Sequence, residues 1–267
     1  MRMQSGQPKG TGRRVCFQDG AMDFFTQWLL GYQTYGGAEW GECLAACDGI
    51  RDGDPTTWVE AWSALGSRLQ AQAERSREHG HGVSARTAYL RAAMAYRTAS
   101  LCAHPKEPRF LELLDRLRAT FTAAGALFAP AIEAVRIPFG KRQLVGYVAR
   151  ASSTVAPLLI AVGGVETYVE EMYFWAAAPA MRRGYHTLFV ELPGQGAAAM
   201  AGLSLRDDVE PALRAMLDYA WALPQIDTGR VALYGVGSGS LLGTYALLAE
   251  PRFRAAAMNP PGTDLHR

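Results

Sequence analysis

The segment Gly235–Ser240 (GVGSGS) has residue types and a spacing that suit a sharp turn from a strand into a helix. In the pattern G-x-S-x-G, such a turn presents a nucleophilic serine, and the two glycines relieve the crowding around it. Gly235 and Gly239 have this spacing here, but the residue between them is Gly237, which has no side chain. We therefore predict a nucleophile elbow in which the attacking hydroxyl is absent from position 237.

Ser238 offers a hydroxyl one position later. As a nucleophile it would be flanked by Val236 and Ser240, which suit a crowded turn less well than two glycines do. If the site is active, we expect Ser238 to act as a displaced hydroxyl or as a main-chain amide donor. A dinucleotide-binding loop is disfavoured because Ser240 stands where G-x-G-x-x-G needs its third glycine, and no lysine follows to make a P-loop.

A second turn, residues 163–167 (GGVET), follows the apolar run Pro157–Val162. Main-chain amides that are held where negative charge develops can stabilise an oxyanion. We predict this role, or a related role in substrate binding, for the amides of Gly164 and Val165.

Two neighbouring features are interpreted as structural. Thr167 and Glu170 match the S/T-x-x-E capping box of a helix start, which accounts for Glu170 without a catalytic role. A third turn, residues 191–196 (ELPGQG), is rich in turn-forming residues. We predict that it is a structural loop beside the site.

The elements around these turns alternate between strands and helices from residue 129 onward. A hairpin is predicted over residues 132–150, with its turn at residues 139–142. Strands are then expected at 157–162, 186–191, 230–235 and 253–258, and helices at 167–183, 205–223 and 240–250. This order predicts an α/β fold with a mostly parallel sheet, which binds ligands at the carboxyl ends of its strands.

Residues 1–128 have a different pattern, which predicts a helical N-terminal domain that begins with a flexible basic tail at 1–15. Long helices are expected at 56–77, 84–102 and 108–128, and Trp58, Trp62, Leu65 and Leu69 form one apolar stripe. We interpret Trp40, Trp58 and Trp62 as packing residues first, and as candidates to line the site second.

Composition limits the class of partner. The chain has 267 residues, of which 49% are apolar, and a net charge of +2, so it is expected to be globular and to lack the basic footprint of a nucleic-acid-binding protein. No apolar run approaches the roughly 20 residues of a membrane span, and no C-x-x-C pair indicates a zinc ribbon. We expect a cytoplasmic protein with reduced cysteines that binds a small molecule and needs no metal and no cofactor.

These motifs resemble the α/β-hydrolase family of the fermentation–respiration switch protein and dihydroxypseudooxynicotine hydrolase. The similar stretches are Tyr35–Glu42, Ser84–Tyr96, Gly163–Phe174, Gly184–Gly196 and Arg230–Ser240. The resemblance implies a helical, cap-like domain before a hydrolase sheet, and hydrolysis of a ketone, ester or related acyl substrate through a Ser-Asp-His triad. It also implies that some relatives act by chain shortening or elimination, and that a homodimer is to be expected, which an open sheet edge would favour.

Three departures from the family pattern determine the functional hypotheses. Gly237 stands at the usual serine position, and Val162 stands where a histidine often precedes the paired glycines. The chain ends at Arg267, before the positions where the family has its triad Asp and His. We therefore expect an α/β-hydrolase core at 129–267 that is incomplete at its C-terminus. The alternatives are a catalytically inactive ligand-binding pseudoenzyme and a lyase or cyclase that needs no covalent nucleophile.

The five histidines are all interpreted as surface or packing residues. His79, His81 and His104 lie in polar stretches of the helical half, and His186 opens a strand at the end away from the elbow. His266, at the chain terminus, is the one that we place nearest to the elbow, where a general base would have to lie.

Overall fold

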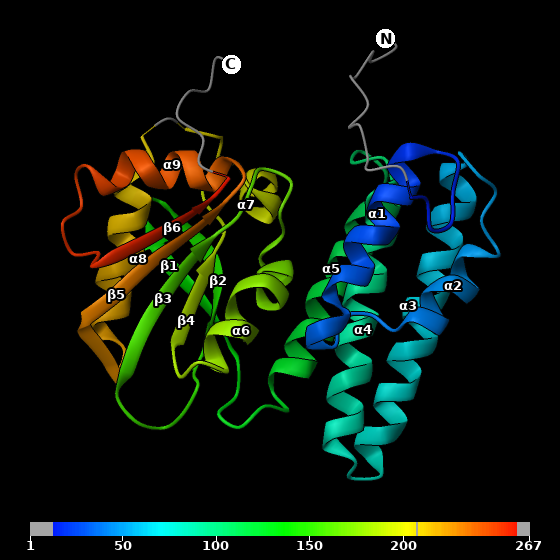
Figure 1. Cartoon of the computed structure of the whole chain (residues 1–267), viewed down its shortest axis with the longest axis horizontal. Helices are drawn as coiled ribbons and strands as arrows, with labels where there is room; N and C mark the ends of the chain where they lie inside the picture. Colours follow the sequence, from blue (N-terminus) through cyan, green and yellow to red (C-terminus); the bar gives the residue numbers. More distant parts are fainter. Residues whose placement is uncertain (1–12, 207, 261–267) are drawn as a thin grey trace. The chain divides into compact units, whose positions relative to one another are not determined.

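The computed structural model describes residues 13–206 and 208–260, and the chain forms two compact units, Met1–Leu127 and Phe128–Arg267. We call them the helical unit and the sheet unit. The predicted fold class is confirmed, because a helical N-terminal region precedes a mostly parallel sheet with helices on its faces (Figure 1).

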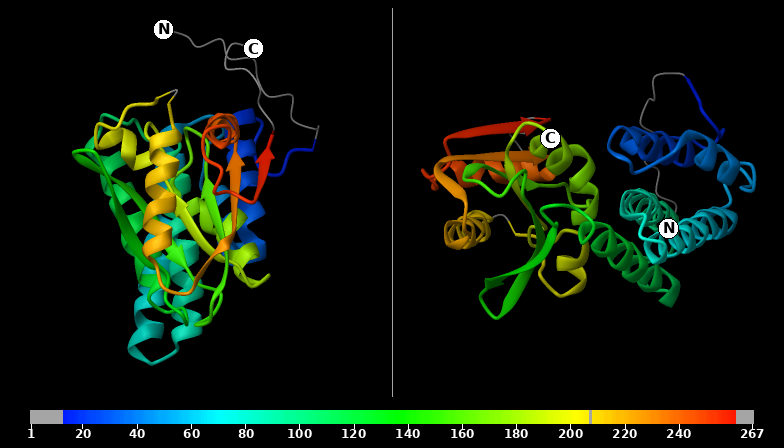
Figure 2. Two further views of the ribbon diagram at one scale, coloured as in Figure 1. Left: turned by 90° about the vertical axis from the view of Figure 1, so that its left-hand side faces the viewer. Right: turned by 90° about the horizontal axis from the view of Figure 1, so that it is seen from below.

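The helical unit is built around two long antiparallel helices, α3 and α4, joined by a short turn (Figures 1 and 2). Pro55 begins α3, and the Asp54 side chain caps it by accepting a hydrogen bond from the amide of Thr56. Gly66 lets the two helices approach closely, because a Cβ there would lie 2.7 Å from the Tyr96 ring. The elements are α1 (Gly20–Gly31), η1 (Tyr32–Tyr35), α2 (Trp40–Cys47), α3 (Pro55–Glu78), α4 (Gly82–Ser100) and α5 (Pro108–Gly125).

The core of the helical unit contains the predicted apolar stripe. Trp58 and Trp62 are fully buried, with ring centroids 5.6 Å apart, and the Trp58 indole N–H donates to the carbonyl of Thr98 at 2.7 Å. These contacts confirm that both tryptophans are packing residues. Trp40, at the start of α2, is 44% exposed.

A buried carboxylate holds the segment that leads into α1. One oxygen of Asp23 accepts the amides of Val15, Cys16 and Phe17 at 2.8–3.1 Å. Burial raises the pKa of Asp23, but these amides and the side chain of Gln27 together outweigh it, so the pKa lies below its ordinary value. The ionised form is therefore the one that stabilises the fold.

Asp23→Asn is expected to lower the free energy of unfolding by about 2 kcal/mol at pH 7, because three amides lose a charged acceptor. A carboxyl whose pKa is depressed by folding stabilises above its unfolded pKa of about 3.9 and ceases to do so as the pH falls through its folded pKa. The gap between wild type and variant should therefore close below about pH 4 in urea unfolding series. Asp115→Asn, at an exposed position on α5, should show no such gap. Equal loss of stability in the two variants would contradict the stabilising role of the Asp23 carboxylate.

The sheet unit has six strands within the described residues, in the order β1-β2-β4-β3-β5-β6. The β1–β2 hairpin turns at Gly140, as predicted, and β2 and β4 are antiparallel, whereas β4, β3, β5 and β6 are parallel. The strands are β1 (Glu133–Phe139), β2 (Arg142–Ala149), β3 (Ala156–Val162), β4 (His186–Val190), β5 (Ile226–Val236) and β6 (Ala255–Asn259).

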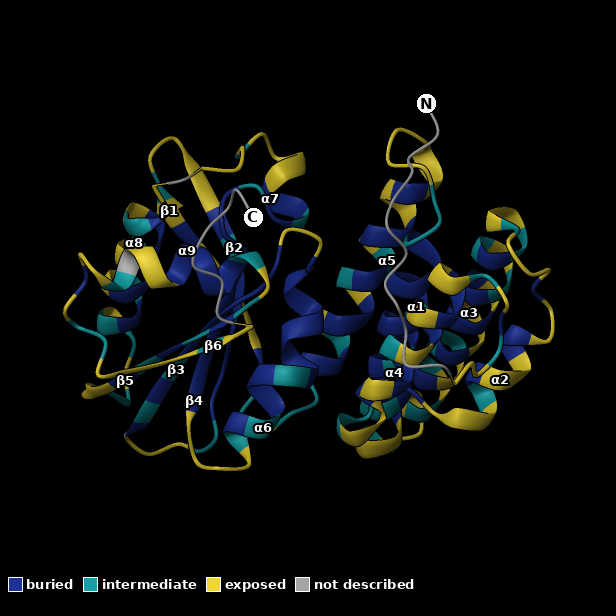
Figure 3. Ribbon diagram, turned by 45° about the horizontal axis from the view of Figure 1, so that its top comes forward, coloured by how far each residue is buried: buried dark blue, intermediate teal, exposed yellow. Residues whose placement is uncertain are grey.

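Helices cover both faces of the sheet. On one face, α8 (Glu210–Ala222) and α9 (Ser238–Leu247) pack on the alternate apolar residues of the strands, such as Leu158, Ile160 and Leu233. The other face carries η2 (Val169–Glu171), η3 (Tyr173–Ala177) and α6 (Ala178–Met181), while α7 (Gly196–Met200) follows β4. Strands β3 and β4 are largely buried and β6 is mostly exposed, as Figure 3 shows.

The single helix predicted over 167–183 is wrong. Residues 169–181 form a 3-10 turn, a π-helical turn and a short α-helix. Pro179 has no amide hydrogen to donate to the carbonyl four residues earlier, which favours the wider π-helical turn before it. The helix expected from 205 begins instead at Glu210, because Pro211 suits the first turn of α8.

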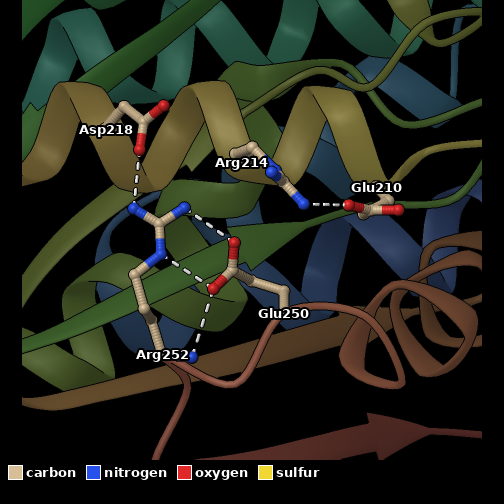
Figure 4. Close-up of polar contacts among 5 residues, drawn as sticks. All are labelled: Glu210, Arg214, Asp218, Glu250 and Arg252. Atoms are coloured by element: carbon tan, nitrogen blue, oxygen red, sulfur yellow. Dashed lines mark hydrogen bonds and ion pairs between the residues drawn. The ribbon is translucent and has the colours of Figure 1, made fainter.

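The loop between α9 and β6 is anchored to α8 by Arg252 (Figure 4). Its guanidinium binds both carboxylate oxygens of Glu250, reaches Asp218 at 2.6 Å and lies 5.4 Å from the ring centroid of Trp221. These bonds from Arg252 hold the pKa of the Glu250 carboxyl below its ordinary value. The contacts hold the loop that leads into β6, whose first residue, Ala255, pairs with Ala232 of β5.

Candidate functional site

The predicted elbow lies where β5 ends at Val236 and α9 begins at Ser238. Gly237 joins them with φ of +60°, in the left-handed region that side chains other than glycine seldom adopt. A strand, one residue at positive φ and a helix are the geometry of a nucleophile elbow. The predicted strand–turn–helix is therefore present, with Gly237 at its apex and exposed.

The two flanking glycines are required by crowding. A Cβ at Gly239 would lie 2.3 Å from the carbonyl oxygen of Gly163, and a Cβ at Gly235 would lie 2.8 Å from that of Gly239. At Gly237, by contrast, a Cβ would meet only Gly164, whose Cα lies 3.4 Å away, an ordinary van der Waals contact. The elbow thus has space for a side chain at 237 and none at its flanks.

Ser240 holds the elbow closed, a role that its local sequence does not indicate. Its buried hydroxyl donates to the carbonyl of Gly235 at 2.7 Å and accepts the amide of Asn259 at 2.8 Å. The Gly237 amide donates to the carbonyl of Asn259 at 2.9 Å. These bonds join the ends of β5 and β6 on either side of the turn.

Ser238 brings a hydroxyl and a main-chain amide to the elbow. Its hydroxyl is buried and has no hydrogen-bond partner among the residues that the structure describes. Its main-chain nitrogen lies on the Gly164 side, 3.8 Å from the point that a Cβ of Gly164 would occupy. This placement favours an amide-donor role over a nucleophilic one, and both remain predictions.

The turn after β3 lies against the elbow, but its first amide is engaged. The amide of Gly164 donates to the hydroxyl of Thr167 at 3.0 Å, and the amide of Thr167 returns to the carbonyl of Gly164 at 3.1 Å. An oxyanion would have to displace the Thr167 hydroxyl from Gly164. Val165, the other predicted donor, is 41% exposed. The binding roles of Gly164 and Val165 stay predictions.

The capping box predicted for Thr167 and Glu170 is wrong, because the 3-10 turn begins one residue later. The amide of Tyr168 donates to the carboxylate of Glu171 at 3.0 Å. Glu170 is fully buried instead and accepts the Tyr147 hydroxyl at 3.0 Å. Local spacing could not identify this pair, since Tyr147 belongs to β2.

The four described histidines lie in the sheet unit (His186) and in the helical unit (His79, His81 and His104). His186 is fully buried, accepts the amide of Ala151 at Nδ1 and faces the carbonyl of Thr154 with Nε2, so the proton lies on Nε2. His266 lies outside the described residues, so its predicted nearness to the elbow is untested.

Residues 13–206 and 208–260 contain no group of three or more His, Cys, Asp or Glu side chains placed to hold a metal ion. No helix in this part of the chain is both long and apolar enough to cross a membrane. The four cysteines are free thiols, and burial is the first cause of a raised pKa at Cys43 and Cys102, to about 11 at each.

A family model described as "Esterase FrsA-like" matches residues 40–266, which include both units and the elbow. The chain belongs to the FrsA-like esterase family. Its sheet unit therefore has the α/β-hydrolase fold, and the resemblance inferred from the sequence motifs is confirmed at the level of family and fold.

Curated relatives of this FrsA-like chain include fungal hydrolases. It is 32% identical over 240 residues to "Hydrolase LUC6" of a Fusarium species, which covers 85% of this chain and 57% of that protein. It is also 32% identical over 252 residues to "20-hydroxy-prefusarin hydrolase FUS2" of Gibberella moniliformis, covering 88% and 60%. The chain thus spans about three-fifths of the length of these relatives.

Solved structures share the fold. The crystal structure of 2,6-dihydroxy-pseudo-oxynicotine hydrolase has a TM-score of 0.74 at 23% identity, covering 84% of this FrsA-like chain and 62% of the other. AbyA5 has a TM-score of 0.60 at 20% identity, covering 87% and 60%. At these identities the likeness establishes the fold alone.

Proposed function

We propose that this FrsA-like chain binds a small ketone, ester or related acyl compound at the β5–α9 elbow, with no covalent intermediate at position 237. One observation carries the proposal: Gly237 occupies the apex of the elbow at φ of +60°, between two glycines that crowding requires. The relatives named as hydrolases support a small hydrolysable compound as the ligand.

Amides near Gly237 would supply the chemistry of such a site. The amide of Ser238 begins α9, where the unbonded N–H groups of a helix favour negative charge. Main-chain donors of this kind stabilise an oxyanion or an enolate without forming a bond to carbon. Binding without turnover, or elimination without a covalent step, is therefore favoured over hydrolysis through a serine ester. A longer chain that supplies further catalytic groups would extend this chemistry.

The proposal is tested with an acylating probe and a binding probe. After incubation with p-nitrophenyl acetate, peptide mass spectrometry should find no acetyl group on residues 235–240. Acetylacetone, a small β-diketone, should broaden and shift the amide resonances of residues 164, 165 and 238 in a nuclear magnetic resonance titration. Acetylation of Ser238, abolished by Ser238→Ala, would overturn the non-covalent proposal. Absence of any shift at these three amides would overturn the binding proposal.

A further inference from the structure

The side chain of Gln195 joins the loop after β4 to the turn after β3, beside the elbow. Gln195 is fully buried in the loop between β4 and α7. Its side-chain oxygen accepts the amide of Leu192 at 2.7 Å, and its side-chain nitrogen donates to the carbonyl of Gly163. Both ends of the side-chain amide are therefore used, and one of them reaches the turn that follows β3.

The Gly163 carbonyl lies at a crowded point of the site. It accepts from Gln195 and also faces Gly239, where a Cβ would lie 2.3 Å from it. The residue that follows, Gly164, is the one that approaches position 237. A displacement of the Gly163 carbonyl would therefore move the turn relative to the elbow.

Glu191 holds the other end of the turn that follows β3, at Val169. Its side chain is fully buried, and its two carboxylate oxygens accept the amides of Val169 and Ala198 at 3.1 and 3.0 Å. Residues 163–169 are thus held at their first residue by Gln195 and at their last by Glu191. Both side chains come from the segment 191–196, for which the sequence predicts a structural loop.

We propose that Gln195 and Glu191 are positioning residues, which set where the Gly164 and Val165 amides lie relative to the elbow. One consequence of this role rests on the proposed function: the two side chains determine the affinity of the elbow for a ketone or acyl ligand. Neither side chain touches the ligand. They act through the turn that they hold.

Gln195→Glu tests the proposal, because it keeps the shape of the side chain and replaces a donor with a carboxyl. When ionised, that carboxyl repels the Gly163 carbonyl; when protonated, it can donate to it. Hydrogen exchange of peptides covering residues 163–169 is measured between pH 5 and pH 9 and corrected for intrinsic rates. Exchange should be about tenfold faster than in wild type at the alkaline end, which corresponds to about 1.4 kcal/mol, and should return to the wild-type rate at the acid end.

Gln225→Glu is the matched control. The Gln225 side chain also donates to a main-chain carbonyl, that of Ser153 at 2.7 Å, at the other end of the sheet where β5 begins. The same chemical change there should leave the exchange of residues 163–169 at the wild-type rate. A plain loss of stability in Gln195→Glu would instead speed exchange throughout the sheet unit, β3 and β5 included, and not only at residues 163–169.

Glu191→Gln is the second variant, and it retains one acceptor oxygen for two amides. It should speed exchange near Val169 at every pH, even if the Gln195 variant does not fold. Wild-type exchange of residues 163–169 in Glu191→Gln, or in a folded Gln195→Glu at all pH values, would overturn the positioning role. Acetylacetone binding is a separate readout: if the wild type does not bind it, the proposed function fails, and the exchange measurements still decide the positioning role.

Discussion

Gly239→Ala is expected to destabilise the sheet unit by about 3 kcal/mol, whereas Gly237→Ala should cost about 1 kcal/mol. The new methyl group at 239 would lie 2.3 Å from the Gly163 carbonyl oxygen and 3.0 Å from that of Val162, and both are backbone atoms of neighbouring chain that cannot rotate away. At 237 the cost is that of holding a side chain at positive φ.

Urea unfolding followed by far-ultraviolet circular dichroism measures these differences. Gly235→Ala belongs to the same series and should resemble Gly239→Ala, because its Cβ would lie 2.8 Å from both the Gly239 carbonyl oxygen and the Ser240 Cα. Equal effects at all three positions would mean that the crowded turn does not exist. An elbow that has space for a side chain at 237 and none at 235 and 239 requires a smaller loss of stability at 237 than at the two flanks.

Trp58→Ala should destabilise the helical unit by about 4 kcal/mol, the largest effect that we expect of a single substitution there. The side chain is fully buried, contacts the rings of Phe17, Phe25 and Trp62, and donates to the carbonyl of Thr98. Its removal leaves a cavity and a main-chain carbonyl without its donor.

Trp40→Ala provides the comparison, because Trp40 is 44% exposed at the start of α2. It should change the free energy of unfolding by less than about 1 kcal/mol. Hydrogen exchange in α3 and α4 shows whether the loss of stability lies in the helical unit. Unfolding is followed by circular dichroism because the substitutions remove tryptophan fluorescence. A Trp58→Ala protein as stable as the Trp40→Ala protein would contradict the packing role of Trp58.

The elbow was predictable because its information is local. Gly235, Gly237 and Gly239 lie within five residues. Crowding at the two flanks admits only glycine, and glycine adopts the positive φ at the centre without strain. The apolar stripe of α3 and the Gly140 hairpin were predictable for the same reason, since period and turn chemistry are read over a few residues.

The tertiary structure alone decided which buried polar groups meet. Gln195 reaches a carbonyl 32 residues away, Glu170 accepts from Tyr147 across 23 residues, and Ser240 joins an amide 19 residues away. Nothing in the local pattern of each segment indicates its partner, because strand order brings them together. The segment 191–196 could therefore be identified from the sequence as a turn, but not as the anchor of the turn after β3.

The sequence by itself thus determined the fold class, the turn geometry at 235–239 and the absence of a side chain at its apex. The fold decided that the Ser238 hydroxyl is buried and that the Gly164 amide already has an acceptor in Thr167. The physical reason is that backbone conformation follows from neighbouring residues, whereas the availability of a hydroxyl or an amide depends on what packs against it.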